Sequence, residues 1–188
     1  MKSVGMKRSL IFILMIALLL FSGCGGKEET WISDDDILAD YHKAVEAYSL
    51  FHMNTMDTDY EESVFLDDYD YSKVDHDTIH TYSDLENYLK TIFSDDLVNR
   101  LLTENEVELY RDIDGALYTI PAGRGSDIFK GDETYDISRE GDTKFIVKVT
   151  VEVYDDPDSE EVVDYEVFEF PYELVNGKWV FTDFDLVR

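Results

Sequence analysis

Residues 143–154 read TKFIVKVTVEVY, and this stretch decides the fold. Its apolar residues recur at every second position, so they share one face of an extended strand. Valine, branched at Cβ, packs well on a pleated surface and is typical of strands. The stretch therefore predicts a strand that buries one face against a core. The residues on that face are Phe145, Val147, Val149, Val151 and Val153.

Turn sequences on both sides of this strand predict further strands. Asp114-Gly115 and Asn176-Gly177 are strong hairpin signals, and Glu140-Gly141-Asp142 separates two more apolar runs. Pro171 lies inside one predicted strand and indicates an edge or a bulge there. The expected strands are 107–113, 116–120, 133–139, 143–154, 162–174 and 178–187.

The N-terminal half shows a helical period instead. Apolar residues recur three and four apart over residues 34–52, which predicts one amphipathic helix with an acidic N-terminal end. Ser83-Asp84-Leu85-Glu86 predicts a capping box that opens a helix through Phe93, and Ser94-Asp95-Asp96 caps another to about Thr103. Residues 53–81 predict only a strand near 63–66 with a loop after it. The expected fold is α+β, with N-terminal helices followed by a curved antiparallel β-meander in a single domain.

The N-terminus has the features of a lipoprotein signal. Lys2, Lys7 and Arg8 precede an apolar run at 10–21, which is followed by Ser22-Gly23-Cys24. The run is short for a membrane-spanning helix. We expect a signal peptide at 1–23, a tether at 24–33 that is lipidated (palmitate) on Cys24, and a domain at 34–188. The protein would then be anchored on the extracellular face of the cell membrane. The alternatives are a single-pass anchor, or an ordinary signal peptide with an incidental cysteine.

The charge of the chain restricts its partners. The net charge is −27, and removal of the three basic residues of the leader takes it to −30. Such a surface argues against binding to nucleic acid, anionic lipid or anionic wall polymers. It favours a basic protein partner, a cation, or solubility alone. Cys24 is the only cysteine, so no disulfide is expected.

No catalytic or cofactor signature stands out, and we expect a binding protein rather than an enzyme. His76 and His80 are spaced i, i+4 but lack the glutamate of a zinc protease motif. The acidic clusters at 57–59, 67–70 and 155–158 lack the calcium-loop pattern and are interpreted as solvated surface. No metal site or cofactor is predicted.

One loop is distinctive. Residues 120–127 read IPAGRGSD, and we call Gly123, Arg124, Gly125, Ser126 and Asp127 the glycine loop. Glycine allows backbone angles that are closed to other residues and lets the chain approach a partner closely. The simpler interpretation is a tight turn that leads to a short helical turn capped by Ser126 and Asp127.

Several segments together resemble the IseA-type family of DL-endopeptidase inhibitors. They are Ser83-Asp84-Leu85, Ile92-Phe93-Ser94, Tyr110-Arg111, the glycine loop and Asn176-Gly177-Lys178-Trp179-Val180-Phe181, and the resemblance covers about 81–188. It implies an exported protein of Gram-positive bacteria that blocks cell-wall DL-endopeptidases, papain-like cysteine enzymes that cut peptidoglycan stem peptides.

The resemblance also implies a mechanism, in which a Gly-x-Gly loop enters and occludes the enzyme's cleft. The matching positions here are Gly123, Arg124 and Gly125. Arg124 departs from the acidic residue expected between the glycines, and the lipid anchor is a second departure. The alternative function is a lipoprotein that binds a small ligand or cation in a nuclear-transport-factor-like or cystatin-like cone fold. An exposed glycine loop would favour the first hypothesis, and a deep aromatic-lined pocket between helix and sheet the second.

Overall fold

The computed structural model describes residues 32–159 and 161–188. The predicted signal peptide, Cys24 and tether residues 24–31 lie outside the described residues. Within the described part, residues 33–188 belong to one compact unit.

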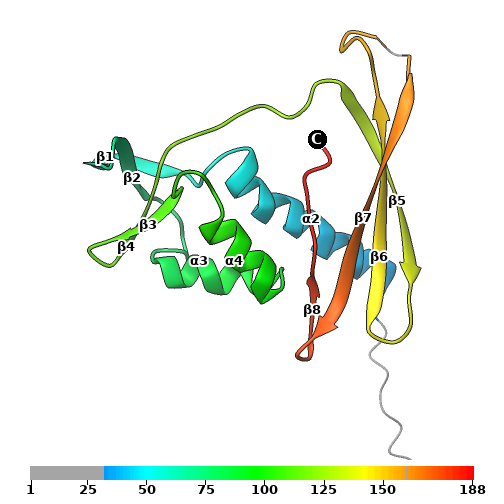
Figure 1. Cartoon of the computed structure of the whole chain (residues 1–188), viewed down its shortest axis with the longest axis horizontal. Helices are drawn as coiled ribbons and strands as arrows, with labels where there is room; N and C mark the ends of the chain where they lie inside the picture. The colour runs from blue at the N-terminus through cyan, green and yellow to red at the C-terminus, as the bar shows by residue number, and fades with distance from the viewer. Residues whose placement is uncertain (1–31, 160) are drawn as a thin grey trace, which may run out of the picture. The chain divides into compact units, whose positions relative to one another are not determined.

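The described residues form three helices and two four-stranded antiparallel sheets (Figure 1), which confirms the predicted α+β class. The helices are α2 (Asp34–His52), α3 (Tyr82–Leu89) and α4 (Asp95–Thr103). The first sheet has the order β1-β2-β4-β3 and the second the order β5-β6-β7-β8. The strands are β1 (Thr58–Leu66), β2 (Tyr69–Val74), β3 (Tyr110–Ile113), β4 (Ala116–Thr119), β5 (Lys130–Arg139), β6 (Lys144–Val153), β7 (Asp164–Val175) and β8 (Lys178–Phe181).

The second sheet is the predicted meander, with β6 at its centre between β5 and β7. The alternation predicted for β6 is confirmed, because Val147, Val149 and Val151 are fully buried. The β7–β8 turn has positive φ at both Asn176 (52°) and Gly177 (81°). This conformation twists the turn to match its strands and explains the Asn-Gly pair.

Two expectations for the end of the meander are refined. The strand predicted for 178–187 is too long, since β8 ends at Phe181 and the chain turns away to bury Phe184 and Val187 in the core. β8 pairs with β7 only from Tyr172 to Val175, so Pro171 stands where the partner strand ends. The predicted edge at Pro171 is therefore confirmed, and proline is tolerated there because no ladder hydrogen bond from its nitrogen is required.

The first sheet contains a strand that the sequence pattern did not reveal. β2 joins β1 through a tight turn and pairs with β4, so the hairpin at Asp114-Gly115 belongs to this sheet and not to the meander. Eight of the nine β1 residues are exposed. The strand predicted near 63–66 lies within β1 and is confirmed, but the loop predicted after it is wrong, because β2 follows there. β2 buries the adjacent residues Tyr71 and Ser72 and therefore lacks a strict alternation, which is why periodicity missed it.

The helices begin close to their predicted starts. Ser94 caps α4 as predicted, accepting a hydrogen bond from the Leu97 N–H. The predicted capping box of α3 is wrong by two residues, because Thr81 and Asp84 form it rather than Ser83 and Glu86. The Asp84 carboxylate also accepts from the His80 N–H, which adds an acceptor at the positive end of the helix.

Aromatic rings fill the interface between α2 and the second sheet. Tyr41 of α2 contacts Phe170 of β7 with ring centroids 5.6 Å apart, and Tyr172 donates a hydrogen bond to Asp40 over 2.6 Å. The segment between α3 and α4 pairs with β8 through hydrogen bonds of 2.9 Å from Ser94 N to Phe181 O and from Phe181 N to Ile92 O. The other rings of this cluster are Tyr48, Phe93, Phe181 and Phe184.

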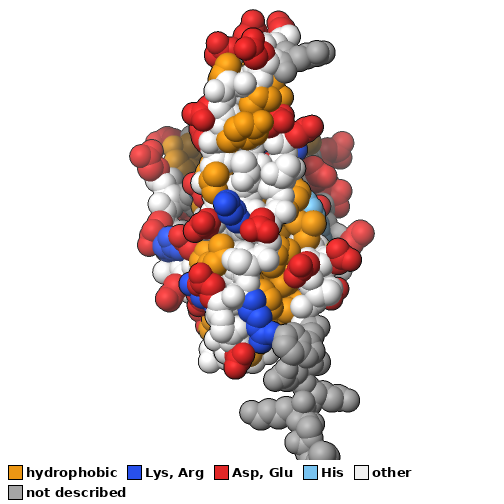
Figure 2. Space-filling model, turned by 90° about the vertical axis from the view of Figure 1, so that its right-hand side faces the viewer, with side chains coloured by type: hydrophobic (Ala, Val, Ile, Leu, Met, Phe, Trp, Pro, Cys, Tyr) orange, Lys and Arg blue, Asp and Glu red, His pale blue; other side chains and the backbone are white. Residues whose placement is uncertain are grey.

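The outer side of the second sheet is exposed and mixed in character. Figure 2 shows this side of the molecule, with hydrophobic side chains lying among many acidic and few basic ones. Val163, Tyr165 and Val167 contribute exposed apolar surface before and along β7. In the described ranges, no helix combines the length and apolarity needed to cross a membrane.

Candidate functional site: the glycine loop and its surroundings

The glycine loop lies in the connection that runs from β4 to β5 (Figure 1). Every residue from Pro121 to Phe129 is exposed. Exposed loops held by regular secondary structure often form the binding surface of a protein, and the glycine loop is in such a position.

The first part of this connection is fastened to the chain that follows α2. Gly123 forms a β-bridge with Asn54, flanked by hydrogen bonds from Thr55 N to Ala122 O (3.0 Å) and from Arg124 N to Met53 O (2.6 Å). The Thr55 hydroxyl accepts from Ala122 N at 3.1 Å. These bonds hold the entry to the loop in one place.

Arg124 has a structural partner that explains why this position is basic. Its Nε donates to the main-chain carbonyl of His52 over 2.6 Å, at the C-terminal end of α2. The last carbonyls of a helix lack intrahelical donors and carry partial negative charge, so a guanidinium there is favourable. The departure from an acidic residue is thus accounted for by a helix end, which sequence reasoning missed because the two residues are 72 positions apart.

The two glycines do not need their conformational freedom in this structure. The glycines with positive φ among the described residues are Gly115, Gly141 and Gly177, so the expectation of unusual backbone angles in the glycine loop is wrong here. A Cβ on Gly125 would meet no atom within 4 Å, and one on Gly123 would meet its nearest neighbours at 3.9 Å. Neither glycine is demanded by the fold, which leaves close approach of a partner as a reason for them.

The second part of the loop is less constrained. No described residue accepts a hydrogen bond from the N–H of Gly125 or Ser126. Asp127 accepts from Phe129 N at 3.0 Å and forms a turn, so the short helical turn predicted after Ser126 and Asp127 is wrong. Ile128 follows with its side chain 66% exposed. Free N–H groups and an exposed apolar residue thus lie together at this end of the loop.

A cavity of about 250 Å³ borders the glycine loop at Ser126, and we call it the Tyr41 cavity. α2 contributes Tyr41 and Val45, and β5 contributes Glu133 and Tyr135. Burial raises the pKa of Tyr41, and the negative charge of Glu133 adds to this effect. Burial and the hydrogen bond to Glu133 raise the pKa of Tyr135 to about 12. Both phenols are therefore neutral hydrogen-bond donors at physiological pH.

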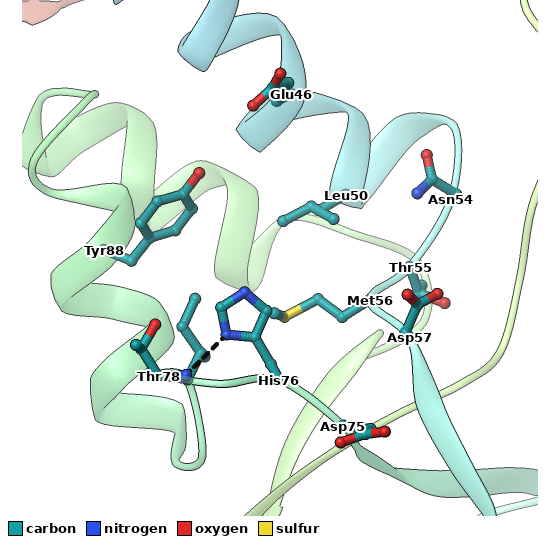
Figure 3. Close-up of a pocket in the computed structure, with 11 residues that line it drawn as sticks. Glu46, Leu50, Asn54, Thr55, Met56, Asp57, Asp75, His76, Thr78 and Tyr88 are labelled. Atoms are coloured by element: carbon teal, nitrogen blue, oxygen red, sulfur yellow. Dashed lines mark hydrogen bonds between the residues drawn. The ribbon is translucent and has the colours of Figure 1, made fainter.

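A second cavity, of about 330 Å³, is lined in part by the segment that holds the loop (Figure 3). Asn54 and Thr55 line it, and the same residues fasten Gly123 and Ala122. The His76 ring lies among the lining side chains, and its Nδ1 accepts from Thr78 N at 3.2 Å and Ile79 N at 3.1 Å. His76 thus stabilises a turn. Within 32–159 and 161–188, no three His, Cys, Asp or Glu side chains gather in a way that could hold a metal ion.

The profile of the IseA DL-endopeptidase inhibitor family matches residues 28–186. This chain belongs to that family. The match spans all of the helices and strands described above, including the glycine loop. A comparison with curated proteins finds no match.

Membership of the IseA family confirms the resemblance inferred from the sequence. It supports inhibition of cell-wall endopeptidases as the activity and DL-endopeptidases as the partners, and it agrees with a protein that is not itself an enzyme. The family match assigns no role to individual residues. The glycine loop as the contact and the lipid on Cys24 remain predictions.

Proposed function

We propose that this IseA-family protein is a lipoprotein that inhibits cell-wall DL-endopeptidases by inserting the glycine loop into their active-site cleft. The observation that carries the proposal is the loop itself, which is exposed at Gly125 and Ser126 and fastened at Gly123 and Arg124. A loop with a fixed base loses less conformational entropy on binding than a free one, so more of its contact energy appears as affinity.

The chemistry of the loop suits an enzyme cleft. With no Cβ at position 125, the backbone can approach the walls of a cleft closely, and the N–H groups of Gly125 and Ser126 are free to donate. If the targets are papain-like cysteine enzymes, as the resemblance implies, the inserted loop would donate these N–H groups to main-chain acceptors in the cleft, as an extended peptide does. Ile128 adds apolar surface beside this contact.

The leader supports the anchored form of the inhibitor. Lys2, Lys7 and Arg8, the short apolar run and Ser22-Gly23-Cys24 together predict acylation of Cys24. A tether of a few residues would then hold the inhibitor near the membrane on its outer face. Its targets would be hydrolases that act on the wall close to the membrane.

The competing hypothesis requires a deep pocket between helix and sheet. That interface is instead occupied by packed rings, such as Tyr41 against Phe170 and Phe184. The Tyr41 cavity does lie between α2 and β5 and is lined by two tyrosines, but its volume of about 250 Å³ is below the usual size of a ligand pocket, and it borders the glycine loop at Ser126. Loop insertion is thus the function that the described residues support best.

The decisive experiment measures clearing of a peptidoglycan suspension by a DL-endopeptidase in the presence of each variant. Gly125→Pro fixes φ near −65° and removes the free N–H. We expect it to weaken inhibition at least about tenfold, which corresponds to about 1.4 kcal/mol of binding energy. Val162→Pro is the matched control, because its N–H also has no acceptor among the described residues and it lies in the loop before β7. It should inhibit like the parent.

Thermal melts would confirm that both proline variants are folded. If Gly125→Pro inhibits as well as the parent, insertion of the glycine loop is wrong. If the parent inhibits no DL-endopeptidase, the inhibitor function itself is wrong for this chain.

A further inference from the structure

One half of β7 lacks a neighbouring strand on the side away from β6. β6 pairs with β7 from Asp164 to Glu173, whereas β8 pairs only with Tyr172–Val175. The other side of Asp164–Phe170 therefore meets no strand among the described residues, and Figure 1 shows β8 beside only the far end of β7. We call this side of Asp164–Phe170 the β7 edge.

The main chain of the β7 edge faces away from the sheet at alternate residues. Thr182 N donates to Pro171 O over 3.1 Å, so the carbonyl of Pro171 faces away from β6. Main-chain groups alternate in direction along a strand, and the carbonyls of Tyr165, Val167 and Glu169 therefore face the same way. No described residue donates to these three carbonyls or accepts from the N–H of Val167. A row of unpaired groups of this kind is what a further strand needs for pairing.

The other free edges of the two sheets are short or irregular. β3 and β8 have only four residues each. A bulge or irregularity interrupts β1 between Asp59 and Ser63, and another interrupts β5 between Lys130 and Glu133. Short strands and bulges are common means by which proteins prevent pairing at an edge. The pairing of β6 with β7 has no such irregularity, so the β7 edge is regular as well as unpaired.

The side chains of the β7 edge alternate between acidic and apolar residues. Glu166 stands opposite the buried Val151 of β6, so it lies with Asp164 on the inner face of the sheet. Tyr165 and Val167 lie on the outer face and are 59% and 52% exposed. Figure 2 shows this outer side, where hydrophobic side chains lie among acidic ones. A strand that pairs here would meet carboxylates on one face and apolar groups on the other.

The surroundings of the β7 edge are strongly acidic. Residues 152–169 contain nine acidic residues and no basic one. Lys130 pairs with Glu166 over 2.7 Å and is the only ion-pair partner of this segment among the described residues. The Glu166 side chain is still 49% exposed, which leaves room for a second cation. A second copy of the chain would bring like charges together and destabilise the pairing, so the charge selects a basic partner.

We propose that the β7 edge binds an extended basic segment of another protein, which joins the sheet as an antiparallel strand beside β7. Basic side chains of the segment lie against Asp164 and Glu166, and apolar side chains lie against Tyr165 and Val167, so the segment alternates the two kinds. Every strand pair of this sheet is antiparallel, and antiparallel pairing is slightly more stable than parallel pairing. This binding does not depend on inhibition by the glycine loop.

The probe is the rhodamine-labelled peptide Lys-Val-Lys-Val-Lys-Val-Lys-amide, and its fluorescence anisotropy is measured against the full-length chain in a mild nonionic detergent. We expect saturable binding with a Kd on the order of 0.1 mM. The peptide Glu-Val-Glu-Val-Glu-Val-Glu-amide has the same apolar residues but the opposite charge, so it should bind at least about tenfold more weakly. Absence of saturable binding by the basic probe up to about 2 mM would overturn the proposal.

Strand pairing is separated from charge attraction by methylating the main chain of the probe. Methylation of two valine nitrogens removes N–H groups that face β7 in the antiparallel arrangement, whereas methylation of two internal lysine nitrogens removes N–H groups that face solvent. Both peptides keep the charge of the probe. The first should bind at least about tenfold more weakly than the probe, and the second within about twofold. Equal binding by the two methylated peptides would overturn strand addition, because charge alone would then attract the probe.

The position of the contact is tested with two exposed valines. Val167→Lys adds a positive charge and removes apolar surface at the β7 edge, so it should weaken binding of the basic probe about tenfold. Val64→Lys makes the same substitution on β1, where Val64 is 38% exposed, and should change binding by less than about twofold. Equal weakening by the two variants would overturn the assignment to the β7 edge, because both change the net charge equally.

Sedimentation velocity of the full-length chain in the same detergent decides between the proposed partner and a second copy. We expect the parent to sediment as a monomer. A dimer that Val167→Lys dissociates and Val64→Lys does not would overturn the basic partner, because the β7 edge would then pair with itself. Thermal melts establish whether both variants are folded. The methylated probes are measured on the parent, so they decide the proposal even if Val167→Lys fails to fold.

Discussion

Arg124 donates a hydrogen bond of 2.6 Å to the carbonyl of His52, and this contact joins the glycine loop to the C-terminal end of α2. This contact explains why a basic residue stands between the two glycines, and it helps to fix the base of the loop. One side chain thereby connects the longest described helix to the proposed inhibitory segment.

Removing this contact should destabilise the protein modestly. Arg124→Met keeps much of the aliphatic stem but loses the charge and the donor, and we expect the free energy of unfolding to fall by about 1 kcal/mol. Urea denaturation measures the change. Lys178→Met removes an exposed positive charge from β8 and should shift the value by less than about 0.5 kcal/mol. Equal effects of the two variants would show that Arg124 contributes only through net charge.

Reversing the charge at the same position should have a larger effect. Arg124→Asp places a carboxylate beside the negative end of α2, so it should lower stability more than Arg124→Met. Its effect on inhibition must then be compared at a temperature where both variants are folded. Improved inhibition by a folded Arg124→Asp would indicate a target with a positively charged cleft. Stability equal to that of Arg124→Met would contradict the dipole argument.

Stability should depend on the protonation of His52. Burial lowers the pKa of its imidazole, and the nearby Arg124 lowers it further while Asp185 acts in the opposite direction. The unfolded chain then binds a proton more readily than the folded one below about pH 6.5. The contribution of His52 is therefore full above this pH and is lost as the pH falls toward the depressed folded value.

Melting temperatures at a series of pH values from about 7.5 to 5 test this dependence. In His52→Gln the decline across that interval should be shallower than in the parent. His42→Gln is the control on the same helix. An unchanged profile in His52→Gln would rule out His52 as a source of the pH dependence.

The acidic surface should govern the association with a basic target. The net charge of −27 for the whole chain attracts a positive partner over a distance that shrinks to ~8 Å at physiological ionic strength. The association rate with a DL-endopeptidase should fall by about tenfold or more between about 0.05 and 0.5 M salt, with a smaller change in dissociation. Surface plasmon resonance separates the two rates. A flat association rate would mean that the charge serves solubility alone.

The anchor makes a prediction that is independent of the fold. Cys24→Ala removes the acceptor of the lipid, so the protein should leave the membrane fraction or remain unprocessed. Cell fractionation and metabolic labelling with a fatty acid measure location and acylation. Ser22→Ala keeps a small residue before the cysteine and should be processed normally. A Cys24→Ala protein that is cleaved and stays membrane-bound would refute lipidation.

Elements with a regular burial pattern could be predicted from the sequence. Tyr41, Ala44 and Tyr48 share one face of α2, and the valines of β6 alternate, because each element buries one face against a core. The Asn176-Gly177 turn could also be predicted from the sequence, since its positive φ values favour those two residue types. Local sequence therefore determined the α+β class, the order of most elements and the identity of the exposed loop.

Tertiary structure decided what the glycine loop contacts. The partner of Arg124 is a main-chain carbonyl, and every residue offers one, so no sequence pattern marks His52 as the acceptor. The pairing of β2 with β4 was hidden for a different reason, because β2 buries adjacent residues and shows no strict alternation that would mark it as a strand. The unpartnered Tyr41 hydroxyl is likewise a property of the packing of α2 against β5 and β7. Periodicity reports which face of an element is buried, whereas contacts between distant segments depend on where the whole chain brings them.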